Sequence, residues 1–202
     1  MKFLDKQKRL PLKESKLGSA FFMIYFCVFL ASALPDWSWD YGFVNISLGT
    51  ILYLLIIGSW VRNDNSKRFF SIMSYCVLFT MAFVFSQPIV RLMLIAESKM
   101  WVVLIILWIG IFIFTTMMKD KIFESFSSPG KTKASIALHL FMLFLIIVTP
   151  ILIFVGSFLL QQFIELDATF VMCGILLYVI SLVLLVILPG FLKKPEDIIV
   201  QK

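Results

Sequence analysis

Long blocks of apolar residues, separated by short polar segments, set the pattern of this chain. An α-helix rises about 1.5 Å per residue, so about 20 apolar residues cross the roughly 30 Å hydrocarbon layer of a bilayer. None of the blocks contains Asp, Glu, Lys or Arg. Six blocks approach or exceed the length needed, and they cover residues 18–34, 42–61, 69–87, 100–118, 134–160 and 169–192. The pattern therefore predicts an all-α, polytopic integral membrane bundle of six transmembrane helices.

The positive charges fall on alternate segments of this pattern, which predicts the orientation of the bundle. Sixteen of the eighteen Lys and Arg residues lie at the two ends of the chain and in loops 62–68 and 119–133, whereas the other loops hold only Arg91 and Lys99. Basic residues are retained on the cytoplasmic side, where they attract anionic headgroups. We therefore expect a multi-pass protein of the cell membrane with both termini cytoplasmic. Its expected parts are a basic tail at 1–17, one transmembrane domain at 18–192 and a second tail at 193–202.

Composition agrees with this interpretation and argues against several classes of function. The chain is 61% hydrophobic and 15% charged, with a mean hydropathy of +1.00, whereas soluble domains average about 25% charged residues. The net charge of +6 is explained by the loops between spans, so we expect no nucleic-acid partner. The single histidine and three dispersed cysteines match no zinc, haem or disulfide pattern, and no G-x-S-x-G elbow occurs. We expect no enzymatic activity, metal or cofactor.

The first apolar block has two interpretations. It follows a basic segment and ends in Ala31-Ser32-Ala33, which resembles the small-residue site at which signal peptides are cleaved. The block is long enough to act as a span, however, and Pro35 follows closely. We expect the block to remain as a membrane anchor, with cleavage as the alternative.

Residues 88–99, PIVRLMLIAESK, are the least regular stretch of the chain. Pro88 is expected to end or kink the preceding span, because proline lacks an amide N–H and clashes with the carbonyl four residues earlier. In the favoured interpretation the stretch is a short helix in the outer interface, with Arg91 snorkelling to the headgroups. In the alternative it re-enters the membrane in part, and Arg91 faces a cavity as a binding residue.

Two residues of block 134–160 are poorly explained by spanning alone. Pro150 lies past its middle and is expected to bend the helix by leaving the carbonyl of Ile146 unbonded. His139 lies near the cytoplasmic end and is expected to be an interfacial polar residue, with proton handling as the alternative. Together with Arg91, these two residues are the candidate functional or gating positions.

The outer loops carry aromatic and acidic side chains. Tryptophan and tyrosine after the first block are typical of the aromatic belt at a membrane interface. Acids lie beside them and also in the loop between the last two blocks. The candidate residues for binding at the outer face are Asp36, Trp37, Trp39, Asp40, Glu165 and Asp167.

Several short patterns have structural interpretations. Asn45-Ile46-Ser47 matches the glycosylation pattern, but it lies at or inside the membrane edge and is discarded. Ser47, Gly49 and Thr50 are expected to form a small-residue surface for close helix contact. Residues 63–65 are expected to form a turn. The Gly-Lys-Thr at 130–132 lacks the earlier glycine of a phosphate loop and is rejected.

These observations predict a function only in outline. The six blocks lack the ionisable groups on which proton relays depend, which disfavours proton-driven transport through this chain alone. Short loops without a soluble domain favour a non-enzymatic membrane component of the cell envelope, acting as a subunit or permease of a transport or export assembly. The alternative is an immunity or resistance protein that protects the membrane by binding a membrane-active toxin. The expected partners are the lipid bilayer and either another membrane subunit or a toxin.

Overall fold

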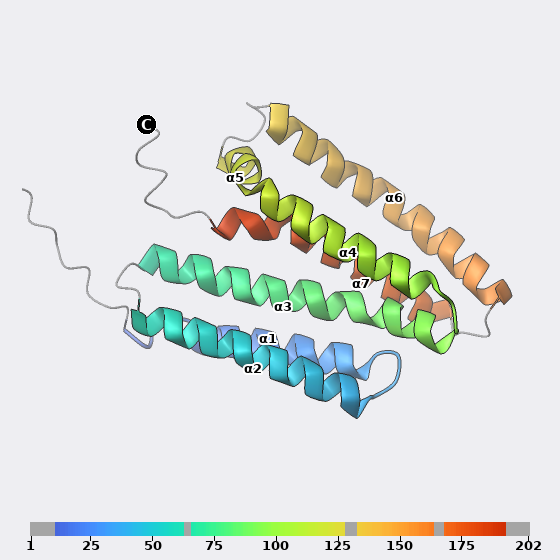
Figure 1. Ribbon diagram of the computed structural model, residues 1–202, viewed down its shortest axis with the longest axis horizontal. Helices are drawn as coiled ribbons and strands as arrows, with labels where there is room; N and C mark the ends of the chain where they lie inside the picture. The colour runs from blue at the N-terminus through green and yellow to red at the C-terminus, as the bar shows by residue number, and fades with distance from the viewer. Residues whose placement is uncertain (1–10, 63–65, 128–132, 164–167, 193–202) are drawn as a thin grey trace, which may run out of the picture.

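The computed structural model describes residues 11–62, 66–127, 133–163 and 168–192, and every regular element in these ranges is a helix. Figure 1 shows their arrangement. In chain order they are α1 (Leu17–Ala33), α2 (Trp39–Arg62), α3 (Ser66–Ile95), α4 (Met100–Met117), α5 (Lys119–Ser127), α6 (Lys133–Phe163), α7 (Ala168–Ile187) and the 3-10 helix η1 (Leu188–Leu192). The all-α prediction is therefore confirmed.

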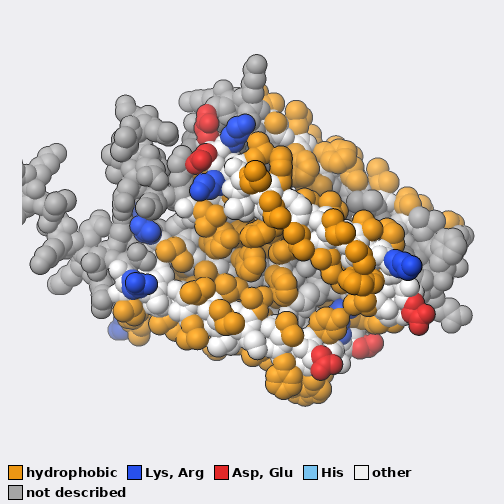
Figure 2. Space-filling model, in the orientation of Figure 1, with side chains coloured by type: hydrophobic (Ala, Val, Ile, Leu, Met, Phe, Trp, Pro, Cys, Tyr) orange, Lys and Arg blue, Asp and Glu red, His pale blue; other side chains and the backbone are white. Residues whose placement is uncertain are grey.

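Five of the helices, namely α2, α3, α4, α6 and α7, are long and apolar enough to cross a membrane. Helix α1 is also apolar but has 17 residues, which corresponds to about 25 Å. Large hydrophobic side chains point outward along these helices. Figure 2 shows that they cover most of the middle of one face, with charged side chains at its two ends. This surface is the reverse of a water-soluble one and shows a polytopic membrane protein.

Successive long helices run in opposite directions and form two packed groups (Figure 1). Helices α1, α2 and α3 pack on one another, and their shared core includes Ile24, Ile56 and Phe69. Helix α3 also packs on α7, through a second core that includes Leu92 and Leu185. Helices α4 and α6 each contact α7. Because successive long helices alternate in direction, the start of α1 and the end of η1 lie at the same end of the bundle. We call this end, where α5 also lies, the α5 end (Figure 1).

Close helix contacts occur where glycine removes a side chain. A Cβ atom on Gly49 of α2 would lie 3.0 Å from a methyl carbon of Ile24 and 3.3 Å from one of Val28, both on α1. The hydroxyl of Thr50, also on α2, lies 2.8 Å from the hydroxyl of Tyr25 on α1. The predicted small-residue contact surface is thus present at Gly49 and Thr50, whereas Ser47 is exposed.

The prediction for residues 88–99 is wrong in both of its forms. Helix α3 continues through Pro88 to Ile95 as a single helix of 30 residues, so there is neither a separate interfacial helix nor a re-entrant segment. Pro88 and Ile89 are buried in the bundle. Tertiary packing therefore holds this helix together, although proline cannot bond to the carbonyl of Val84.

One other segment also differs from its predicted form. Residues 119–127, expected within a loop, form the helix α5, which packs on α6 and η1 and buries Ile122. Helix α6 continues through Pro150, and the Thr149 hydroxyl donates to the carbonyl of Leu145 at 2.5 Å. The bend at Pro150 stays a prediction. Helix α7 ends at Ile187, before Pro189, and passes into η1, so the two together cover the predicted block 169–192.

Some predictions fall outside the described residues. They concern the first ten residues of the basic tail, the turn at 63–65, the Gly-Lys-Thr segment at 130–132, the acids Glu165 and Asp167, and the tail at 193–202.

Candidate functional site

Arg91 is buried inside the bundle, where it holds the loop between α1 and α2. Its side chain is 5% exposed. Nη1 donates to the carbonyl oxygens of Ala31 at 3.2 Å and Ser32 at 3.3 Å, and also to that of Leu34. Nη2 donates to the carbonyl oxygen of Asp36 at 2.5 Å. The predicted snorkelling of Arg91 to headgroups is therefore wrong. The guanidinium instead gives the carbonyls at the end of α1 and in the following loop a charged donor, and it compensates their partial negative charge.

An aromatic ring completes the environment of Arg91. Its guanidinium carbon lies 4.6 Å from the ring centroid of Tyr41, in the first turn of α2. Such a contact adds about 0.5–2 kcal/mol, with the larger value in a desolvated site. One side chain on α3 thus connects the end of α1, the loop at 34–38 and the start of α2.

A second polar group lies deeper along the same three helices, and we call Ser32, Asn45 and Gln87 the amide cluster. Asn45 Nδ2 donates to Gln87 Oε1 at 2.8 Å, and Gln87 Nε2 donates back to Asn45 Oδ1 at 2.6 Å. Asn45 Nδ2 also donates to the Ser32 hydroxyl at 3.1 Å, and that hydroxyl donates to the carbonyl of Val28 at 2.7 Å. The side-chain amides of α2 and α3 therefore satisfy each other, and Ser32 connects them to α1, as a lipid environment favours.

The loop that Arg91 holds and the first turn of α2 present two tryptophans at the surface. Trp37 is 41% exposed and Trp39 is 66% exposed, and their rings meet edge to face at 5.3 Å. Asp36 and Asp40, on either side of this pair, are exposed. We call Asp36, Trp37, Trp39 and Asp40 the loop patch. Four of the six predicted outer-face residues therefore form one continuous surface, while the other two lie outside the described residues.

The other two candidate positions lie elsewhere in the bundle. Pro150 and His139 are both on α6, which packs along α7, whereas Arg91 lies on α3 and faces α1. His139 is exposed, and its Nδ1 lies 2.6 Å from the carbonyl oxygen of Ser135, one turn earlier. A local bond of this kind fixes the imidazole on its own helix. The structure therefore does not bring the three candidate gating residues together.

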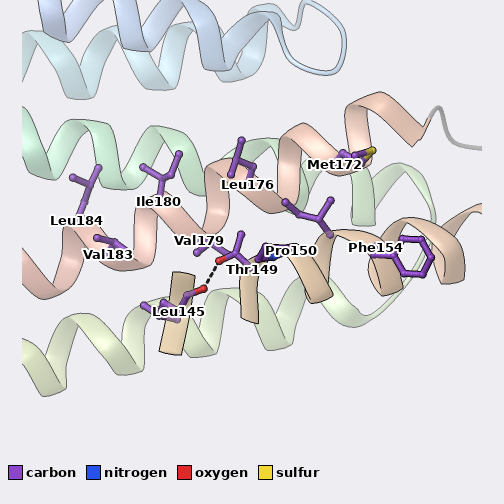
Figure 3. A pocket seen from close by; sticks show the side chains of 11 residues that line it. Leu145, Thr149, Pro150, Phe154, Met172, Leu176, Val179, Ile180, Val183 and Leu184 are labelled. Atoms are coloured by element: carbon purple, nitrogen blue, oxygen red, sulfur yellow. Dashed lines mark hydrogen bonds between the residues drawn. The ribbon is translucent and has the colours of Figure 1, made fainter. Parts of the chain in front are cut away.

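Pro150 lines a groove between α6 and α7 with a volume of about 620 Å³. Figure 3 shows the side chains of the two helices that face it. The only polar side chain among the described lining residues is that of Thr149, whose hydroxyl is engaged by the carbonyl of Leu145. The remaining walls are aliphatic or aromatic, and they include Leu145, Phe154, Leu176 and Val183. We call this space the α6–α7 groove, and its surface suits an apolar occupant.

The described residues offer no recognisable metal centre. Among them, no group of three or more His, Cys, Asp or Glu side chains could hold a metal ion. Cys27, Cys76 and Cys173 are free thiols that lie on three different helices.

Sequence reasoning missed the amide cluster and the role of Tyr41. The sequence pattern presents Asn45 only within a glycosylation motif, and Gln87 only as the last residue of the apolar block 69–87. The signal for both was present, because side-chain amides in apolar blocks commonly hydrogen-bond across helices. Their pairing joins residues 42 positions apart, and neither residue alone indicates its partner.

Comparisons with protein-family models, with curated proteins and with solved structures find no match for this chain.

Proposed function

We propose that this chain is a non-enzymatic subunit of a membrane assembly in the cell membrane, engaged in transport or export. The observation that carries the proposal is the position of α6. Between Ile136 and Gly156, none of its described side chains is buried within the chain, and it borders the α6–α7 groove. Transmembrane helices associate by close packing with other helices. The absence of buried positions among the described side chains of α6 supports a role in contacts with another membrane subunit.

The proposed topology has six spans with both termini in the cytoplasm. Helix α1 supplies the sixth span, because it packs against both α2 and α3 and is only slightly shorter, at about 25 Å, than the hydrocarbon layer. The α5 end of the bundle carries most of the basic segments, which supports its placement in the cytoplasm. The loop patch then lies outside.

The internal chemistry favours a subunit over a solute permease. Arg91 is the only charged side chain that is buried among the described residues, and backbone carbonyls and the ring of Tyr41 occupy its guanidinium. The described residues that line the α6–α7 groove include no charged one. A polar solute crossing the bilayer needs replacement hydrogen bonds along its route, and these surfaces do not provide them. We therefore assign the groove to a transmembrane helix of the partner subunit.

Site-specific photo-crosslinking tests this assignment. A photoreactive phenylalanine analogue replaces Leu176 in the α6–α7 groove, and a matched probe replaces Leu55, which is exposed on α2. In cells expressing the chain at its natural level, the probe at 176 is expected to give one crosslinked product with an integral membrane protein, and the probe at 55 none. Equal products from both positions, or no product from 176, would overturn the proposal.

The loop patch supports a second candidate, an immunity or resistance protein. Because Arg91 fixes the loop backbone, Trp37 and Trp39 are presented without much further ordering, which lowers the cost of binding. The exposed Asp36 and Asp40 complement a cationic, membrane-active toxin. In this case a strain carrying Trp37→Ala with Trp39→Ala would lose protection as completely as a deletion strain. Unchanged sensitivity of the deletion strain to every toxin encoded nearby would exclude this candidate.

A further inference from the structure

Helix α5 is a short amphipathic helix at the end of the bundle where we place the cytoplasm. It carries Lys119, Asp120, Lys121 and Glu124, yet Ile122 is buried between them. It packs on α6 and on η1. A helix that has one charged and one apolar side, at the end of a transmembrane bundle, lies at the level of the lipid headgroups.

A second groove opens beneath α5, with a volume of about 420 Å³. Four helices contribute to it, and its apolar walls include Phe114, Met118, Ile122, Phe141 and Val186. We call this space the α5 groove. Its volume lies within the range of roughly 300–1,000 Å³ that is usual for small-molecule sites.

The polar side chains of the α5 groove, other than one lysine, are turned to their own backbones. The Thr115 hydroxyl donates to the carbonyl of Ile111 at 2.8 Å, and the Ser125 hydroxyl donates to that of Lys121 at 2.7 Å. Both hydroxyls are therefore engaged, and the walls present mainly hydrocarbon. Lys121 is exposed and is the only charged residue among the described ones that line the groove. Asp120 and Glu124 of the same helix are not part of the lining.

We infer that the α5 groove binds an anionic phospholipid, with one acyl chain along the apolar walls and the headgroup phosphate at Lys121. The combination of a hydrocarbon-lined cleft and a cation at headgroup depth complements both parts of such a lipid. A free phosphate ion would use only the ammonium group and leave the apolar walls exposed. The inference rests on the membrane placement in the proposed function, but it does not depend on any partner subunit.

Native mass spectrometry of the full-length chain, released from detergent micelles, tests this inference. The protein is mixed with phosphatidylglycerol or with phosphatidylcholine of the same acyl chains, and the fraction carrying one lipid is measured. Phosphatidylglycerol is expected to bind more tightly than phosphatidylcholine. Lys121→Gln is expected to reduce its affinity about fivefold, the effect of removing one basic residue near a lipid headgroup. Inorganic phosphate at the same concentration is expected not to displace it.

Two variants separate the headgroup contact from the acyl-chain contact. Lys119→Gln removes a neighbouring exposed lysine that does not line the groove, and it is expected to leave the affinity unchanged within twofold. Ala137→Trp fills the groove from α6 and is expected to reduce the retention of both lipids. The thermal melting of each variant in detergent verifies folding. Lys121→Arg, which keeps the positive charge, is expected to retain the preference for phosphatidylglycerol.

Three results would overturn the inference. These are equal binding of the two lipids, equal effects of the substitutions at 121 and 119, and full lipid retention by Ala137→Trp. None of these measurements involves a partner subunit. A failure here would therefore leave the crosslinking test at Leu176 unaffected, and the reverse also holds.

Discussion

Asn45 of α2 and Gln87 of α3 exchange two side-chain hydrogen bonds, of 2.8 and 2.6 Å, inside an apolar bundle. Each amide satisfies the other, and Ser32 extends the contact to α1. A hydrocarbon environment offers no water as a substitute partner, so a shift of one helix along the other would leave buried amides unpaired. The pair therefore sets the register of the three helices that carry the loop patch.

Replacing only one amide of this pair is expected to destabilise the protein more than replacing both amides. Asn45→Leu and Gln87→Met each leave an unpaired amide and are expected to lower the free energy of unfolding by about 1–2 kcal/mol. The double variant is expected to lose less than the sum of the two, because no orphaned amide remains. Unfolding by sodium dodecyl sulfate in mixed micelles gives the four values. Strict additivity would show that the two side chains do not interact.

Arg91→Lys is expected to loosen the loop at 34–38, although it keeps the charge. A lysine ammonium cannot reproduce the planar fork that contacts four carbonyls and stacks on Tyr41. The loss is expected to be about 1.5–3 kcal/mol in the free energy of unfolding. Hydrogen exchange is the sharper measurement, because the amides of Leu34 and Ser38, which bond to carbonyls of α1, are expected to exchange faster.

Lys99→Met is the matched control for Arg91, since Lys99 is exposed at the same end of the bundle. It is expected to change neither stability nor exchange in the loop. Unchanged protection of Leu34 and Ser38 in Arg91→Lys would contradict the role that we assign to the guanidinium.

Two glycines of α2 give a matched test of the contact with α1. A Cβ on Gly49 would meet Ile24 at 3.0 Å, whereas nothing lies within 4 Å of one on Gly58. Gly49→Leu is therefore expected to force the helices apart and to destabilise the protein by about 1–3 kcal/mol. Gly58→Leu is expected to be neutral or slightly stabilising, because leucine is the better helix former. Equal melting temperatures of the two variants would refute the close packing at Gly49.

Ser181 of α7 connects three helices through one hydroxyl. It accepts a hydrogen bond from Trp108 Nε1 at 2.9 Å and donates to the carbonyl of Ala82 at 2.5 Å. Ser181→Ala removes both bonds and is expected to lower the free energy of unfolding by about 1–2 kcal/mol. Ser47→Ala, at an exposed position of α2, is expected to have no measurable effect in the same titration. A loss of equal size in both variants would argue against the network.

The long helices were predictable from the sequence because their apolar blocks are uninterrupted. Block 42–61 lies within α2, and block 100–118 ends one residue beyond α4. Lipid exposure imposes this composition on a helix directly, so the pattern survives without knowledge of its neighbours. The amphipathic α5 is not predictable in the same way, because nine residues with four charges resemble an ordinary loop.

The region around Pro88 could not be predicted, because its structure depends on residues far away in the chain. Proline indicates a helix end when only local bonds are considered. Here Arg91 finds its partners on α1 and in the following loop, 55 to 60 positions earlier, and the extension of α3 also packs on α7. Local sequence gives no measure of such contacts, so it predicts either a snorkelling Arg91 or one that faces a cavity, and not the observed packing against the end of α1.

The proposed function and the proposed lipid site both depend on one topology. In it the bundle crosses the membrane an even number of times, with the α5 end in the cytoplasm. Cysteine labelling in intact cells tests it directly, in a variant in which Cys27, Cys76 and Cys173 are replaced by alanine. Single cysteines at the exposed positions Glu97 and Lys119 lie at opposite ends of the bundle. An impermeant maleimide is expected to label position 97 in intact cells and position 119 only after permeabilisation. Labelling of position 119 in intact cells would contradict the proposed topology.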